Sequence, residues 1–222
     1  KNYDVYVGGV DAYSTLGWFK DPVLNTFIDS SERRLASLIF HELAHQRLFV
    51  AGDTEFNEAF ATAVGEEGLR RWLELRNDPV QLERSRKDRD RRKQFVGLVL
   101  STREQLRAVY ESALPTQDKR SKKGEVLAQM RKNYENLKVE WGGFDGYDEW
   151  FDGPVNNAQL NTISTYYDLV PAFHQLMQEV DGDLEKFYAA AARMSKLTKE
   201  QRHQRLAELL KESTNRSVAS TQ

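Results

Sequence analysis

The sequence predicts an α+β fold that is mostly helical, and three features of its 222 residues lead to this prediction. Residues 4–7 alternate with period two before a pair of glycines, which is typical of a short strand and predicts a small N-terminal β edge. Apolar residues recur with the helical period from about residue 35 to residue 72. Residues 77–140 are rich in charge and predict a long helical hairpin. We expect one domain over residues 1–222, with 77–140 inserted into it.

Two helices joined by a tight turn should follow the N-terminal edge. Asp29 and Glu32 have the spacing of a capping box at the start of the first helix. Gly52 interrupts the helical pattern, and Asp53 or Thr54 can cap the second helix. The sequence therefore predicts an antiparallel helical hairpin that turns near Gly52.

The first of these helices carries the pentapeptide His41-Glu42-Leu43-Ala44-His45. Positions i and i+4 lie on one face of a helix, so His41 and His45 can direct two imidazoles at one zinc ion while Glu42 acts as a general base. With 4 histidines in the chain, such a match arises by chance roughly half a percent of the time. The alternative is a helix that only exposes two histidines.

A catalytic zinc usually has three protein ligands, and the chain has no cysteine to supply the third. If Gly52 is the pivot, His45 lies seven residues before it and Glu58 six residues after it. At about 1.5 Å rise per residue the two lie at nearly the same height. Glu55 is closer to the pivot and better suited to the first turn of its helix. Glu58 is therefore the predicted third ligand.

A histidine pair of this spacing followed by a glutamate on the next helix resembles the gluzincin metallopeptidases, and residues 57–61 (NEAFA) look like the segment around their glutamate ligand. The interval between His45 and Glu58 is shorter than usual, and Thr62 stands where thermolysin-like members carry an aspartate. More of the chain resembles a bacterial family of predicted aminopeptidases, through the segments YVGGV, AYSTLGWF, DPVL, HELAHQRLFV and NNA. The resemblance implies a zincin-like catalytic core.

The reaction implied by this resemblance is hydrolysis of a peptide bond. Zinc held by His41, His45 and Glu58 polarises the carbonyl and activates water, and Glu42 takes the proton. The intermediate also needs an oxyanion donor. The candidates are Tyr166, Tyr167 and His174, and Tyr166 is preferred because it follows the Asn-Asn-Ala segment at a family-like distance. For each tyrosine, packing in the core is the alternative.

The substrate should be a peptide or protein. Residues 7–15 resemble the edge strand with which zincin folds pair an extended substrate. A hairpin that only covers the helix pair is an equally reasonable interpretation.

The charged hairpin should open at Pro79, turn over residues 115–124 and return as a helix over residues 125–137. Its basic cluster at residues 83–93 is interspersed with acids. A solvated helix face is therefore a better interpretation than a surface for phosphate or anionic lipid. The stretch at residues 142–153 is rich in glycine, aromatic and acidic residues and should be a loop. It can shape a substrate pocket with Trp150 and Phe151, and calcium binding through its carboxylates is a weaker alternative because the EF-hand spacing is absent.

Charge and hydropathy exclude some functions. A net charge of −2 argues against a nucleic-acid partner. No apolar run reaches the roughly 18 residues that predict a transmembrane helix. Lys1 begins the chain inside the expected strand without an initiator methionine, so we expect the C-terminal part of a longer protein. The resemblance implies a periplasmic protein or a membrane-anchored lipoprotein.

Together these features predict a zinc-dependent peptidase, with aminopeptidase activity implied by the resemblance. The alternative is a zincin-fold peptide-binding or scaffold module whose metal site is structural or inactive. Retention of Glu42 favours the enzyme, because a structural site needs no general base. Exopeptidase or endopeptidase specificity and the oligomeric state do not follow from the sequence.

Overall fold

The computed structural model describes residues 4–8 and 31–219, apart from the side chains of residues 164–166 and 213–219. Eight α-helices and one 3-10 helix make up the described elements, and none of the described residues lies in a strand. The chain divides into two compact units, one formed by Lys1–Gly8 with Arg86–Ser164 and the other by Gly9–Ser85 with Thr165–Gln222. The mostly helical character that the sequence predicts is confirmed in this part of the chain.

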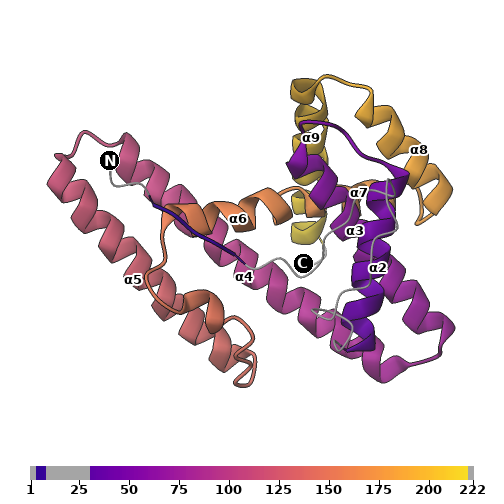
Figure 1. Ribbon diagram of the computed structural model, residues 1–222, viewed down its shortest axis with the longest axis horizontal. Helices are drawn as coiled ribbons and strands as arrows, with labels where there is room; N and C mark the ends of the chain where they lie inside the picture. Colours follow the sequence, from indigo (N-terminus) through magenta and orange to yellow (C-terminus); the bar gives the residue numbers. More distant parts are fainter. Residues whose placement is uncertain (1–3, 9–30, 220–222) are drawn as a thin grey trace. The chain divides into compact units, whose positions relative to one another are not determined.

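Five helices form the unit that carries the two predicted histidine ligands. They are α2 (Glu32–Arg47), α3 (Thr54–Leu75), α7 (Val170–Glu179), α8 (Leu184–Ser195) and α9 (Lys199–Ala219). Figure 1 shows α2 running beside α3, and α7 lying against α3. The core of the unit is aromatic, with Phe56, Phe60, Phe173 and Phe187 fully buried. The Phe60 and Phe187 rings stack with their centroids 5.8 Å apart, and this packing fixes α8 against α3.

The N-cap of α3 is the one that the sequence predicts, whereas the N-cap of α2 is not. Asp53 caps α3, as expected, by accepting a hydrogen bond from the backbone N–H of Phe56 at 3.3 Å. The cap of α2 is Ser31, whose hydroxyl accepts from the N–H of Arg34 at 3.4 Å. Glu32 is therefore the first residue of α2 rather than the third position of a capping box. The expected cap Asp29 lies outside the described residues.

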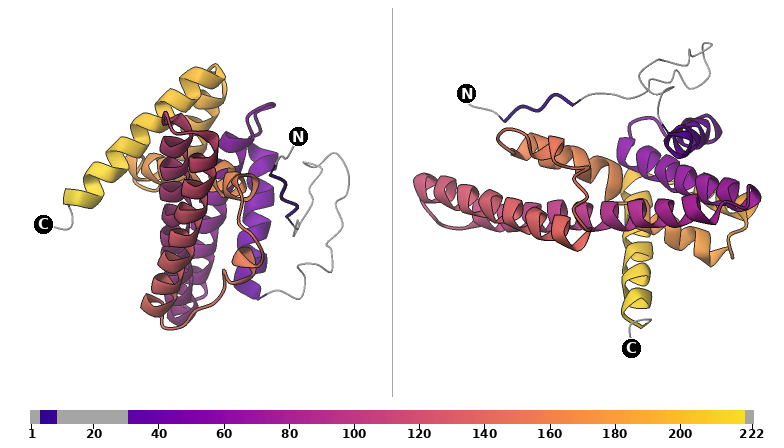
Figure 2. Two further views of the ribbon diagram at one scale, coloured as in Figure 1. Left: turned by 90° about the vertical axis from the view of Figure 1, so that its left-hand side faces the viewer. Right: turned by 90° about the horizontal axis from the view of Figure 1, so that it is seen from below.

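The other unit contains α4 from Arg86 onward (α4 is Pro79–Glu111), α5 (Thr116–Glu140), the 3-10 helix Glu149–Phe151 and α6 (Asn157–Tyr167) up to Ser164. Figures 1 and 2 show α5 returning alongside α4. Their apolar faces meet in a second core, which α6 also joins through Leu160. The core residues of α4 and α5 are Phe95, Val99, Leu106, Met130 and Tyr134.

Two predictions about this unit are wrong. Residues 116–124 are helical rather than a turn, because Pro115 is the N-cap of α5 and its fixed backbone angle suits the start of a helix. Phe151 does not line a substrate pocket, because it is buried and stacks on Tyr134 with ring centroids 4.3 Å apart. The basic cluster at residues 83–93 is on α4 and mostly exposed, consistent with a solvated helix face.

Residues 4–8 do not form the predicted β edge, because none of them lies in a strand. Their polar groups bind the start of α6 instead. The side-chain amide of Asn156 donates to the carbonyl of Val5 at 3.0 Å, and the N–H of Asn157 donates to Asp4 Oδ2 at 3.1 Å. The rest of the expected substrate strand, up to Thr15, lies outside the described residues. The zincin-like core remains a prediction.

In the described part of the chain, no helix is both long enough and apolar enough to cross a membrane.

Candidate metal centre

Helix α2 brings two imidazoles together on one face. His41 and His45 lie one turn apart, and their Nε2 atoms are 3.2 Å from each other. The rings stand nearly perpendicular, at 84°, so that both Nε2 atoms point to a common region rather than stacking. His45 is buried and His41 is half-buried. This is the geometry that the i, i+4 spacing predicts.

Helix α3 adds the carboxylate of Glu58 to this pair. Its Oε2 lies 3.4 Å from Nε2 of His41, and its Oε1 lies 3.7 Å from Nε2 of His45. Atoms bound at about 2.0–2.2 Å to one tetrahedral zinc ion are separated by roughly 3.3–3.6 Å. The three observed separations, 3.2, 3.4 and 3.7 Å, are close to these values. The residues present therefore fit a single small divalent cation.

The protonation state of His45 also suits a metal ion. Burial lowers the pKa of His45, and the neighbouring His41 lowers it further, whereas Glu58 opposes them. His45 is therefore neutral near pH 7, and neutral imidazole is the form that binds metal ions. Its Nδ1 atom is buried and has no hydrogen-bond partner within the described residues. Two imidazole nitrogens and one carboxylate make a donor set typical of zinc.

The turn between α2 and α3 is held by Asn57, the residue immediately before Glu58. Its side-chain oxygen accepts from the N–H of Val50 at 2.8 Å, and its side-chain nitrogen donates to the carbonyl of Val50 at 2.8 Å. Gly52 takes a left-handed conformation with φ of 80°, which glycine adopts without steric cost. Asn57 is buried. These contacts fix the register in which His45 faces Glu58.

The N-terminus of α3 is further anchored by charged residues of α9. Asp53 Oδ2 accepts from Nε of Arg202 at 2.7 Å, and Oδ1 lies 2.9 Å from Nε2 of His203. Both Asp53 and Arg202 are buried. Burial raises the pKa of Asp53, but the hydrogen bonds from His203 and Arg202 outweigh it and leave that pKa below its ordinary value. The pair therefore stays ionised and ties α9 to the start of α3.

A second group of possible ligands occurs at this anchor, namely Asp53, Glu55 and His203. Nε of Arg202 already binds Asp53, and Lys199 Nζ lies 4.0 Å from the same carboxylate. These positive charges oppose a cation, so this group is better explained as part of the structural anchor.

Two glycines allow α2 to approach α3 closely. A Cβ at Gly65 would lie 2.9 Å from the carbonyl oxygen of Ser37 and 3.4 Å from Cβ of His41. A Cβ at Gly68 would lie 2.6 Å from the ring of Phe40. Neither contact tolerates a side chain without movement. The absence of side chains at these positions is therefore part of what brings His41 to Glu58.

Comparison with known families gives one result. A family model described as "Putative aminopeptidase" matches residues 1–206. The chain belongs to this family. No curated protein and no solved structure matches the chain. Membership in the aminopeptidase family supports a peptidase function in general terms.

The three residues predicted as ligands in this member of the family converge within 4.8 Å of one another. Glu42 lies on α2 between the two histidines and is half-buried. Glu55, the alternative third ligand, is exposed, and its Oε2 lies 3.7 Å from Nδ1 of His203.

The three predicted oxyanion donors are Tyr166, Tyr167 and His174, and the structure describes the side chains of the last two. Tyr166 lies within α6, and its side chain is outside the described residues. Tyr167 packs against the core of the unit that carries the predicted ligands. His174 Nε2 lies 2.9 Å from Oε2 of Glu66, which is eight residues beyond Glu58 and about 12 Å further along α3. Tyr166 therefore remains a prediction.

Sequence reasoning did not identify Asn57, Arg202, His203 or Gly65 as supports of the site. Asn57 could have been suspected, because it opens the family-like NEAFA segment. Arg202 and His203 lie about 150 residues from Asp53 in the chain, and no local pattern connects them.

Proposed function

We propose that this chain is a zinc-dependent peptidase whose metal ligands are His41, His45 and Glu58. The observation that carries the proposal is the convergence of the two histidine Nε2 atoms and the Glu58 carboxylate, whose separations of 3.2–3.7 Å are close to the ligand separation around one tetrahedral zinc ion. Three protein ligands leave a fourth position for water or substrate, as in catalytic rather than structural sites. Family membership supports the same class of reaction.

When bound, zinc supplies a Lewis acid that polarises the substrate carbonyl and lowers the pKa of a bound water to about 7. The chain supplies the proton transfer. Glu42 lies next to His41 on α2, where its carboxylate can accept the proton of the attacking water and return it to the leaving amine. Asn57 and Gly65 act indirectly, because they hold the two ligand-bearing helices in register.

The substrate class follows from the family rather than from the described residues. The family description favours removal of N-terminal residues from peptides. We therefore propose an aminopeptidase, and the bacterial and gluzincin relationship forms part of this proposal. A matched pair of peptides with free and acetylated N-termini tests it. An aminopeptidase cleaves only the free form, whereas an endopeptidase cleaves both.

The decisive experiment compares Glu42→Gln, Glu58→Ala and the control Glu55→Ala. Zinc content is measured by elemental mass spectrometry, and hydrolysis is measured with a mixed peptide library. We expect Glu42→Gln to retain zinc and to lose about 10²–10⁴-fold in kcat/KM, because only proton transfer is removed. Glu58→Ala should lose zinc. Glu55→Ala removes the same side chain one turn earlier on α3, at an exposed position, and should retain both zinc and activity.

Two results would contradict the proposal. Wild-type protein that binds no zinc would remove the metal site and the enzyme together. Wild-type protein that binds zinc through Glu58 but cleaves no peptide would favour the alternative, a peptide-binding or scaffold module with an inactive metal site.

A further inference from the structure

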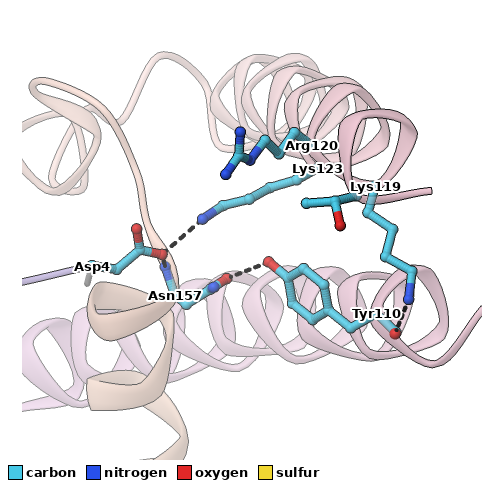
Figure 3. Close-up of a pocket in the computed structure, with 7 residues that line it drawn as sticks. Asp4, Tyr110, Lys119, Arg120, Lys123 and Asn157 are labelled. Atoms are coloured by element: carbon cyan, nitrogen blue, oxygen red, sulfur yellow. Dashed lines mark hydrogen bonds and ion pairs between the residues drawn. The ribbon is translucent and has the colours of Figure 1, made fainter. Parts of the chain in front are cut away.

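A positively charged pocket lies in the unit formed by residues 1–8 and 86–164, far in sequence from the metal ligands (Figure 3). Its volume is about 410 Å³, and it lies at the first turns of α5 and α6. Lys119, Arg120 and Lys123, all from α5, line it together with one carboxylate, that of Asp4. Three positive charges and one negative charge leave the lining with a net charge of +2.

The pocket already holds one anionic group of the chain itself. Lys123 Nζ lies 2.7 Å from Asp4 Oδ2, and the N–H of Asn157 at the start of α6 donates to the same oxygen at 3.1 Å. The hydrogen bond from Lys123, together with that from the Asn157 N–H, holds the pKa of Asp4 below its ordinary value despite partial burial. The surroundings of Asp4 therefore favour negative charge.

The other two cations are not neutralised by any described residue. Lys119 Nζ donates at 2.7 Å to the backbone carbonyl of Tyr110, which carries no charge. Arg120 is exposed and makes no hydrogen bond or ion pair with residues 4–8 or 31–219 (Figure 3). The N-cap of α5 is Pro115, whose side chain cannot accept a hydrogen bond, so the cap residue leaves the first-turn N–H groups beside Thr116 without a side-chain partner.

We propose that this pocket binds a phosphate monoester, with Arg120 as its main ligand and with Lys119 and Lys123 contributing positive charge to the lining. At the assay pH of 7.5, well above its second pKa of about 6, a phosphate monoester carries close to two negative charges and balances the net charge of +2. A single carboxylate or one phosphodiester would leave one charge unbalanced. The guanidinium of Arg120 presents paired donors that match phosphate oxygens.

The pocket volume limits the size of the ligand. At about 410 Å³ the pocket is within the range of small-molecule sites, roughly 300–1,000 Å³. It can accept a small phosphorylated molecule or the exposed phosphate of a lipid headgroup. Both present the same chemistry, so the experiment must separate them. This inference is independent of the proposed peptidase activity.

The test uses the full chain and compares Arg120→Ala with the control Lys122→Ala. Lys122 is two residues away on α5, is paired with Glu125 at 2.7 Å and does not line the pocket. Binding of inorganic phosphate is measured by calorimetry at pH 7.5. Vesicles of phosphatidylcholine with and without phosphatidic acid measure the lipid arm. Wild type should bind phosphate saturably, Arg120→Ala should bind it about 10–100-fold more weakly, and Lys122→Ala should match wild type.

A second variant changes affinity in the opposite direction. Asp4→Asn removes the competing carboxylate but keeps an oxygen for the N–H of Asn157, so phosphate affinity should rise several-fold. Recruitment to phosphatidic acid vesicles that depends on Arg120 would identify a lipid headgroup as the source, and phosphate binding without recruitment would identify a soluble phosphorylated molecule. Absence of saturable binding to either probe would overturn the proposal. So would equal losses in Arg120→Ala and Lys122→Ala, because these would indicate nonspecific charge attraction.

Discussion

Replacing Gly65 by alanine should separate the two helices that carry the proposed metal ligands. The new Cβ would lie 2.9 Å from the carbonyl oxygen of Ser37 and 3.4 Å from Cβ of His41. The first is a backbone atom and the second is the first atom of its side chain, so neither can rotate away. Helices α2 and α3 must move apart by roughly half an ångström before the methyl group reaches ordinary van der Waals contact.

The change in the free energy of unfolding of Gly65→Ala results from two opposing effects. Overpacking typically costs about 1–3 kcal/mol, whereas alanine is favoured over glycine inside a helix by about 1 kcal/mol. Gly97→Ala is the matched control, because Gly97 lies within α4 and a Cβ there meets nothing within 4 Å. It should raise the free energy of unfolding by about 0.5–1 kcal/mol. The change in the free energy of unfolding of Gly97→Ala is subtracted from that of Gly65→Ala. The difference cancels the helix propensity of alanine over glycine and leaves an overpacking cost of about 1–3 kcal/mol.

The assay combines stability and metal binding. Urea unfolding gives the free energies, and amide hydrogen exchange in α2 and α3 shows whether the loss is local to the ligand-bearing helices. Zinc affinity should fall about 10-fold or more in Gly65→Ala, because His41 is displaced, and should not change in Gly97→Ala. A Gly65→Ala variant that is as stable as Gly97→Ala and binds zinc as wild type does would contradict a tight contact between α2 and α3 at Gly65.

Two further substitutions test the supports of the site. Asp53→Asn should keep the cap of α3 but lower the free energy of unfolding by about 2–3 kcal/mol at pH 7, because Arg202 loses its buried ionic partner. The pKa of Asp53 is lowered in the folded state, so its contribution to the free energy of unfolding is present at neutral pH and is lost as the pH falls below about 3.9. Urea titrations at about pH 3 and pH 7 should therefore show a smaller difference in the free energy of unfolding between variant and wild type at the lower pH. Asn57→Ala should cost about 2 kcal/mol and weaken zinc binding about 10–100-fold in a chelator competition, because both hydrogen bonds to Val50 are lost. Unchanged zinc affinity in Asn57→Ala would show that the turn does not set the ligand register.

The convergence of the predicted ligands could be anticipated from the sequence because it depends on local geometry. The histidine spacing places His41 and His45 on one face, and equal distances from Gly52 place His45 opposite Glu58. The structure brings all three within 4.8 Å. Helix rise and a glycine turn are properties of a short stretch of chain, so they can be computed without knowledge of the rest.

Other expectations failed because they depended on partners that local patterns do not specify. The alternation at residues 4–7 predicts a strand, but no described strand lies beside it, and the side chain of Asn156 takes the place of a ladder partner. Trp150 and Phe151 were expected at a substrate pocket. Phe151 is instead buried between α4 and α5, because the apolar faces of these helices need to be covered.

The residue types at the candidate metal centre, their spacing and the position of the turn follow from the amino-acid sequence alone, since hydrogen bonding within a helix sets the distance between neighbouring turns. The sequence alone does not predict three other features: the pairing of Asp53 with Arg202, the close approach at Gly65 and the cationic pocket beside Asp4. Each joins residues that are distant in the chain, and which of many possible partners meet depends on how the apolar faces pack together.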